Sequence, residues 1–89
     1  MPTVAFTENI QRHVNCPTVR VDATTVSEAL EAVFRDNPRV RGYILDDRGA
    51  VRRHMVIFVD GDGLKDRNKL SDPVKPDSEI YVMQALSGG

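Results

Sequence analysis

The sequence predicts an α+β fold in which a mixed sheet of four to five strands packs on one main helix. Three observations support this expectation. Near one end of the chain the segment 3–7 alternates apolar and polar residues, as a half-buried strand does, and near the other end the segment 79–86 is apolar on both faces, as an interior strand is. The segment 55–59 is wholly apolar and rich in the β-branched and aromatic residues that suit strands. One segment, 25–37, carries apolar residues at clear helical spacing, so one helix is expected to cover the sheet.

The first two strands are expected at 3–7 and 18–22. Each has two apolar residues at alternate positions, which places them on one face of the strand. A loop between the two segments would join them as a hairpin.

The helix follows a capping box, Thr25-Val26-Ser27-Glu28. In this motif Thr25 caps the first turn, and Glu28 reaches back to the amide of Thr25. An apolar stripe follows at i, i+3, i+4, i+7 and i+8, formed by Val26, Ala29, Leu30, Val33 and Phe34. Asn37-Pro38 is expected to end the helix.

A second hairpin is predicted beyond Pro38. Its first strand would be 43–45, its turn the polar segment 46–49, and its return arm would begin at Val51 and include 55–59. Asp60-Gly61 is a strong turn signal at the end of that arm. A polar connection is expected at 64–77, anchored by Leu70 and Val74 and broken by two prolines.

The last strand, 79–86, has apolar residues on both faces. Ile80 and Val82 share one face, while Tyr81, Met83 and Ala85 share the other, as is typical of an interior strand. The chain crosses over through the helix, so the first and last strands are expected to lie parallel in the middle of the sheet. This is the β-grasp arrangement.

Length and charge favour a carrier or binding role. A domain of 89 residues buries only about 60 to 65% of its unfolded surface, which leaves little room for a catalytic cleft. The net charge of -1 argues against non-specific attraction to nucleic acid or a membrane. The longest apolar run, 55–59, is too short to span a bilayer. The single cysteine, Cys16, excludes an internal disulfide, and the chain is expected to be cytoplasmic.

Positive charge is concentrated at 37–54. This segment contains five arginines and two aspartates, so its net charge is +3. This segment is either a docking face for an acidic partner or a solvated loop and hairpin, and the second interpretation is favoured because the block is short and mixed.

Other signals are set aside. Cys16 with His13 nearby lacks an orienting third group for nucleophilic catalysis. The segment 60–65 begins like a calcium loop, but Leu64 and Lys65 replace a ligand and the required glycine, so it is interpreted as a turn. His13 and His54 have no zinc spacing, and His54 is expected to begin a strand. We expect no bound metal and no bound cofactor.

The sequence ends in Ser87-Gly88-Gly89, directly after the last predicted strand. Two residues without a Cβ let an extended backbone enter a channel too narrow for side chains. The terminal carboxylate is ionised at neutral pH and a poor electrophile, so a partner would have to activate it. The alternative is a frayed and incidental end.

The order of elements and the terminal motif together resemble the ubiquitin-like β-grasp sulfur-carrier family, which includes the molybdopterin-synthase small subunit, the thiamin sulfur carrier and the cysteine-biosynthesis sulfur carrier. The resemblance covers the whole chain and is most specific at Ser87-Gly88-Gly89 after the strand 80–85. The turn at 60–61 and the segment 70–72 are weaker matches. Molybdopterin-type members often carry a proline pair where this chain has Gln84-Ala85-Leu86, and the longer basic centre, 39–54, is closer to the cysteine-biosynthesis carrier.

The resemblance implies a role as a protein cosubstrate and not as an enzyme, although such a chain could be the small subunit of a sulfurtransferase such as molybdopterin synthase. A ubiquitin-activating-like enzyme would use ATP to adenylate the carboxylate of Gly89. A sulfur donor would then displace AMP, and the thiocarboxylate at Gly89 would serve a sulfur-accepting synthase in cysteine or molybdenum cofactor biosynthesis. Gly88, which has no side chain, would let the tail enter the narrow channel of the activating enzyme. The implied organisation is a β-grasp domain at 1–86 and a flexible tail at 87–89.

The resemblance also implies a docking surface beside the tail. Its candidate residues are Tyr81, Met83, Ala85, Leu86, Ser87 and, as a neighbour, Phe58. For Tyr81 and Met83 an ordinary core position is an equal alternative. Two other functions stay open: a covalent modifier, in which Gly89 forms an amide with a lysine of a target, and a non-catalytic β-grasp interaction module whose diglycine is incidental.

Overall fold

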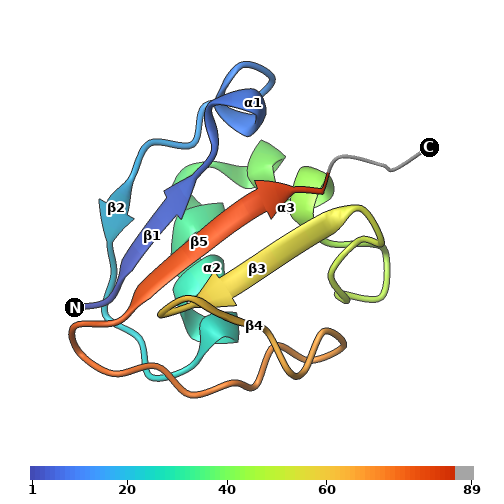
Figure 1. Cartoon of the computed structure of the whole chain (residues 1–89). Coiled ribbons are helices and arrows are strands. Elements are labelled where there is room, and N and C mark those ends of the chain that lie inside the picture. The colour runs from blue at the N-terminus through green and yellow to red at the C-terminus, as the bar shows by residue number, and fades with distance from the viewer. Residues whose placement is uncertain (86–89) are drawn as a thin grey trace.

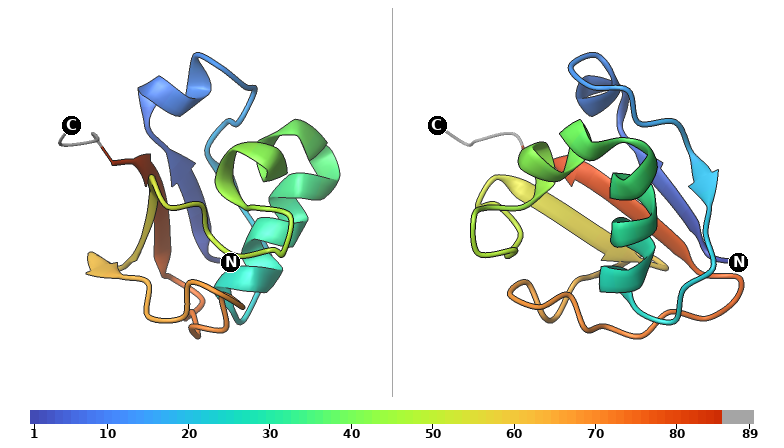
Figure 2. Two further views of the ribbon diagram at one scale, coloured as in Figure 1. Left: turned by 90° about the vertical axis from the view of Figure 1, so that its right-hand side faces the viewer. Right: turned by 180° about the vertical axis from the view of Figure 1, so that it is seen from behind.

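Five strands form one sheet in the order β2-β1-β5-β3-β4 in the computed structural model, which describes residues 1–85 (Figure 1). The elements in chain order are β1 (Thr3–Phe6), α1 (Glu8–Gln11), β2 (Val19–Arg20), α2 (Val26–Asp36), α3 (Pro38–Ile44), β3 (Met55–Val59), β4 (Asp62–Gly63) and β5 (Glu79–Gln84). The sheet and the helices α2 and α3 make two layers (Figure 2). The predicted α+β fold with a mixed sheet, the β-grasp arrangement, is confirmed.

The central strand is β5. It pairs in parallel with β1, where Val4 lies opposite Ile80, and antiparallel with β3, where Ile57 lies opposite Val82. These four side chains are fully buried against the helical layer. The predicted parallel pairing of the first and last strands is therefore confirmed.

The N-terminus of α2 is capped, with one change from the predicted reciprocal box. The amide of Glu28 donates to Thr25 Oγ1 at 3.1 Å, as expected. The Glu28 carboxylate, however, accepts from the amide and the hydroxyl of Thr24, each at 2.7 Å, and not from the amide of Thr25. These hydrogen bonds lower the pKa of Glu28, and the bond from the Thr24 amide has the largest effect.

The predicted strand at 43–45 is wrong, because Pro38–Ile44 forms the helix α3. Pro38 ends α2 but stands at the first position of α3, where its missing N–H costs nothing. Val40 and Ile44 then lie one helical turn apart and are both fully buried. The second hairpin is reduced to a single antiparallel bridge between Leu45 and Val51.

Smaller differences concern element ends. The loop between β1 and β2 contains α1, and β4 pairs with β3 after the predicted Asp60-Gly61 turn, whose φ angles are 51° and 87°. The last strand ends at Gln84 instead of residue 86. His54 lies in a turn before β3 and does not begin the strand. The predicted anchor Leu70 is buried.

No helix among residues 1–85 is long and apolar enough to cross a membrane.

Candidate functional site

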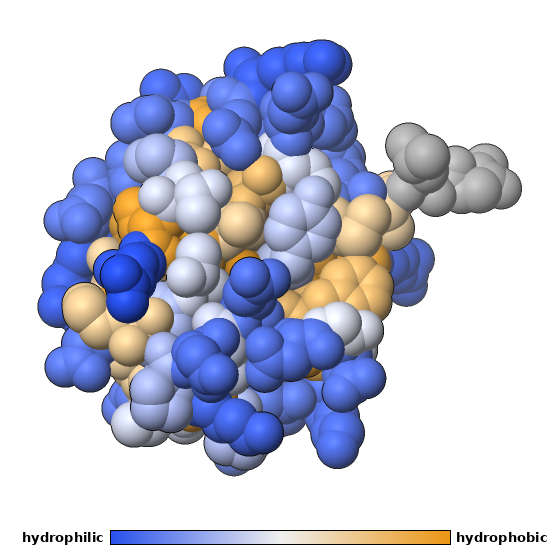
Figure 3. Space-filling view, turned by 60° about the vertical axis from the view of Figure 1, so that its left-hand side comes forward, coloured by the Kyte–Doolittle hydropathy of each residue, from blue (hydrophilic) through white to orange (hydrophobic). Residues whose placement is uncertain are grey.

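The sheet face away from the helices carries a row of apolar side chains, which we call the open face. Phe58 and Ala5 flank Tyr81 on the neighbouring strands, and Val56 lies opposite Met83. Because side chains alternate along a strand, these five residues point away from the core that holds Ile80 and Val82. Figure 3 shows apolar side chains among hydrophilic ones in an oblique view of this side.

The five side chains differ in exposure. Tyr81 is 42% exposed and is one of the few large apolar side chains of residues 1–85 to reach the surface, while Phe58, Met83, Val56 and Ala5 are half-buried. Of the two alternatives for Tyr81 and Met83, the structure supports the surface position, because the helices cover the opposite face. Their role in partner binding stays a prediction.

The open face adjoins the end of β5, and that end is held in place. Gln84 is paired with Met55, and its side-chain Oε1 accepts from Asn9 Nδ2 at 2.8 Å. The amide of Ala85 donates to the carbonyl oxygen of His54 at 2.7 Å. The backbone is thus anchored up to residue 85. The predicted site residues Leu86, Ser87, Gly88 and Gly89 lie outside the described residues.

A hollow of about 170 Å³ lies at this same end of β5. His13 and Tyr43 stack there, with ring centroids 6.2 Å apart and an interplanar angle of 20°, and His54 and Gln84 complete the polar lining. Sequence reasoning considered the two histidines as metal ligands, His13 as a partner of Cys16 and His54 as the start of a strand, and it missed this grouping. No local signal could have revealed it, because the residues come from the loop after α1, from α3 and from the segment before β3.

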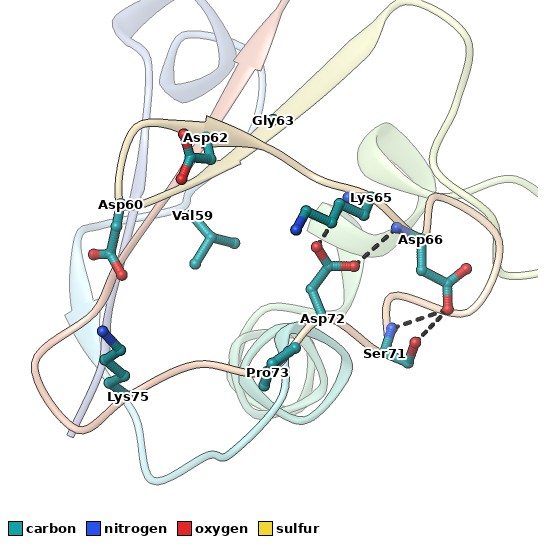
Figure 4. A pocket seen from close by; sticks show the side chains of 10 residues that line it. All are labelled: Val59, Asp60, Asp62, Gly63, Lys65, Asp66, Ser71, Asp72, Pro73 and Lys75. Carbon is teal, nitrogen blue, oxygen red and sulfur yellow. Dashed lines mark hydrogen bonds between the residues drawn. The ribbon is translucent and has the colours of Figure 1, made fainter.

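A second hollow, of about 520 Å³, lies at the other end of β3 and is lined by several aspartates (Figure 4). The carboxylates of Asp60, Asp66 and Asp72 accept from nearby protein groups. Asp72 accepts from the amides of Lys65 and Asp66, and Asp60 accepts from the amide of Glu79 at 2.9 Å. Within residues 1–85 no cluster of three or more His, Cys, Asp or Glu side chains could hold a metal ion. These carboxylates therefore organise turns.

Cys16 lies in the loop before β2 and is only 1% exposed. Burial raises the pKa of its thiol, which disfavours the reactive thiolate. The thiol is therefore unsuited to act as a nucleophile, the role that its position near His13 in the sequence had suggested.

The chain was compared with protein families, with curated proteins and with solved structures, and only the solved structures gave matches. No family model matches the sequence, and no curated protein matches it significantly. Small archaeal modifier protein 1 from Haloferax volcanii shares 22% identity with a TM-score of 0.81, over 99% of this chain and 98% of that one. The BexX/CysO complex from Amycolatopsis orientalis provides a match with 18% identity and a TM-score of 0.83, over the full length of both chains.

Urm1 from Sulfolobus solfataricus shares 13% identity with a TM-score of 0.70, over 93% of this chain and 99% of that one. At such identities the likeness establishes the fold alone. Residues 1–85 therefore have the ubiquitin-like β-grasp fold, and the solved structures that the chain resembles include proteins named as modifiers.

Proposed function

We propose that this chain is a ubiquitin-like sulfur-carrier protein whose Gly89 carboxylate is activated by a partner enzyme and then carries sulfur. One observation supports the proposal most: the central strand of the sheet, anchored through Ala85, leads directly into Ser87-Gly88-Gly89 beside an open apolar face. A rigid strand fixes the direction in which the tail leaves, and the face beside it offers a partner a docking surface.

The chemistry takes two steps on the partner enzyme. The Gly89 carboxylate attacks the α-phosphorus of ATP, pyrophosphate leaves, and an acyl-adenylate forms. Sulfide, HS⁻, from a sulfur donor then attacks the activated carbonyl carbon and displaces AMP, so the product is a thiocarboxylate at Gly89. The thiocarboxylate sulfur passes to an acceptor bound to a second enzyme, in cysteine or molybdenum cofactor biosynthesis. ATP is bound by the activating partner, and the setting is the cytoplasm.

This chain would present its C-terminal residues to the partner enzyme and would not itself catalyse the reaction. Four residues beyond Ala85 can reach on the order of 13 Å at about 3.3 Å per residue. Glycine at the last two positions keeps side chains out of a narrow channel. Tyr81, Phe58 and Met83 would meet the partner while the tail enters its active site.

The experiment is the intact mass of the native chain, purified without reductant, before and after a thiol-reactive alkylator. We expect a fraction of the chain to carry one sulfur in place of one oxygen, and fragmentation should locate this change at Gly89. After alkylation the mass of this fraction should disappear and the mass of a thioester adduct should replace it. A variant lacking Gly89 is the matched control, because it leaves the described domain unchanged. Chains that all end in an ordinary carboxylate, even with activating enzyme and ATP supplied, would contradict the proposal.

A covalent modifier is the second candidate, favoured by the resemblance to the fold of small archaeal modifier protein 1. It shares the adenylation step but ends in an amide between Gly89 and a lysine of a target. The last Lys or Arg of this chain that is not followed by proline is Lys69, so tryptic peptides of purified conjugates would carry residues 70–89 on the target lysine. If the chain lacking Gly89 keeps every measured interaction, an interaction module with an incidental diglycine is the remaining interpretation.

A further inference from the structure

The helical layer contains a cationic hollow that the proposed function does not use. It has a volume of about 310 Å³ and lies where α2 and α3 meet the loops 46–50 and 66–70. Figure 2 shows these two helices toward the viewer in its right-hand view. We call this hollow the basic cleft. Its charged and polar lining consists of Arg41, Arg48, Lys69, Asn68, Ser27 and Glu31.

Hydrogen bonds hold the first loop of the basic cleft in one shape. The Asp46 carboxylate accepts from the amides of Arg48 at 2.8 Å and Ala50 at 3.1 Å. Gly49 has a φ of +84°, and a Cβ placed on it would lie 3.9 Å from Arg41 Nη2. The turn therefore carries Arg48 and lies next to the guanidinium of Arg41.

The second loop is also fixed. Its Asp66 carboxylate accepts from the amide of Lys69 at 3.0 Å, and the carbonyl oxygen of Leu70 accepts from the amide of Ser27 at 2.8 Å, which ties the loop to α2. Leu70 is buried and has a φ of +55°, a conformation that a bulky residue adopts only when its surroundings impose it. The position of Lys69 is thus set by a strained and well-anchored neighbour.

The cations of the basic cleft differ from Arg52 and Arg67 in having head groups that are free of hydrogen bonds in the described part of the chain. Arg52 and Arg67 use their guanidinium groups to bind backbone carbonyls. The side chains of Arg41, Arg48 and Lys69 make no hydrogen bond to another group of residues 1–85, and all three residues are exposed. Against three cations the cleft has one carboxylate, Glu31, in a chain whose net charge is -1.

We propose that the basic cleft binds an acidic peptide segment of a partner protein. The three cations come from three separate elements around the hollow, so they suit several carboxylates spaced along a peptide better than one small anion. A guanidinium fork matches a carboxylate in two-point geometry, and two of the three cations are arginines. The cleft lies in the helical layer, opposite the open face, so an acidic partner could bind while Tyr81 and its neighbours are occupied. The inference is independent of what happens at Gly89.

The test is a titration of the ¹⁵N-labelled full chain with a short peptide rich in Glu and Asp, followed by amide chemical shifts. We expect saturable shifts in the loops 46–50 and 66–70 and in α3. An isosteric peptide of Gln and Asn should produce none. Shifts spread evenly over all basic residues, Arg12 and Arg20 included, would overturn the proposal.

Charge variants make the test specific to the basic cleft. Arg41→Glu and Lys69→Glu should each weaken the binding of the acidic peptide about tenfold. Arg39→Glu lies on the same helix and changes the net charge equally, but it is outside the cleft, so it should change binding less than about twofold. Glu31→Gln should tighten binding. Equal losses from Arg39→Glu and Arg41→Glu, or identical shifts and affinity with inorganic phosphate in place of the peptide, would overturn the proposal. Amide dispersion of each variant verifies its fold.

Discussion

Replacing Tyr81 by alanine is the sharpest test of the open face. Tyr81 is 42% exposed, and an aromatic side chain presents about 200 Å², so about 85 Å² is left for a partner to cover. At about 25 cal/mol per Å², losing that contact costs about 2 kcal/mol of binding free energy. This corresponds to a loss of about 30-fold in kcat/KM for activation of the chain.

Stability should change far less than recognition. In the sheet Tyr81 lies opposite Phe58, and loss of such a cross-strand pair costs up to about 1 kcal/mol. The assay is ATP–pyrophosphate exchange by the activating enzyme with the chain as the varied substrate, with urea unfolding of each variant alongside.

The matched control is Ile80→Val, one residue earlier in β5 and facing the core. Ile80 is fully buried, so this change should lower the free energy of unfolding by about 0.5–1.5 kcal/mol and leave kcat/KM unchanged. An unchanged kcat/KM for a folded Tyr81→Ala chain would refute the reasoning, as would an equal loss in Ile80→Val, because either result removes the distinction between the two faces of β5.

Three further predictions concern stability, each measured by urea unfolding. Ile57→Ala should cost about 2–5 kcal/mol because it leaves a cavity at a fully buried site, and a loss below about 1 kcal/mol would show that the core closes around it. Gly49→Ala should cost about 1 kcal/mol because its φ of +84° disfavours a side chain, although no atom obstructs the new methyl; a stabilised variant would contradict this. The Asp66 carboxylate accepts from the Ser71 hydroxyl and the Lys69 amide, which lowers its pKa below the ordinary value of 3.8. It therefore stabilises the fold above that pH and ceases to do so as the pH falls through its lowered folded-state pKa. Asp66→Asn should thus be destabilised at pH 7, and the gap should close as the pH falls below 3.8; a gap independent of pH would exclude the charge as its cause.

Sequence reasoning was most successful where the signal is local. The capping residue Thr25 and the apolar stripe identified α2, and alternation identified β1, because both patterns follow from backbone geometry within a few residues. The run of apolar residues on both faces identified β5 as an interior strand. The error at 43–45 had a local cause as well. A proline that ends one helix can begin the next, and the signal that Val40 and Ile44 lie one turn apart was overlooked.

Tertiary packing decided what local patterns could not. Both faces of β5 are apolar, so alternation alone could not show which face α2 would cover, and only that choice exposes Tyr81. Arg41 and Arg48 both belong to the basic segment 37–54, but only the two anchored loops and two helices bring them around one hollow together with Lys69. The sequence by itself determined β1, α2, β3 and β5, their β-grasp order and the diglycine ending. The faces and hollows open to partners depend on contacts between distant segments, and therefore on the folded structure alone.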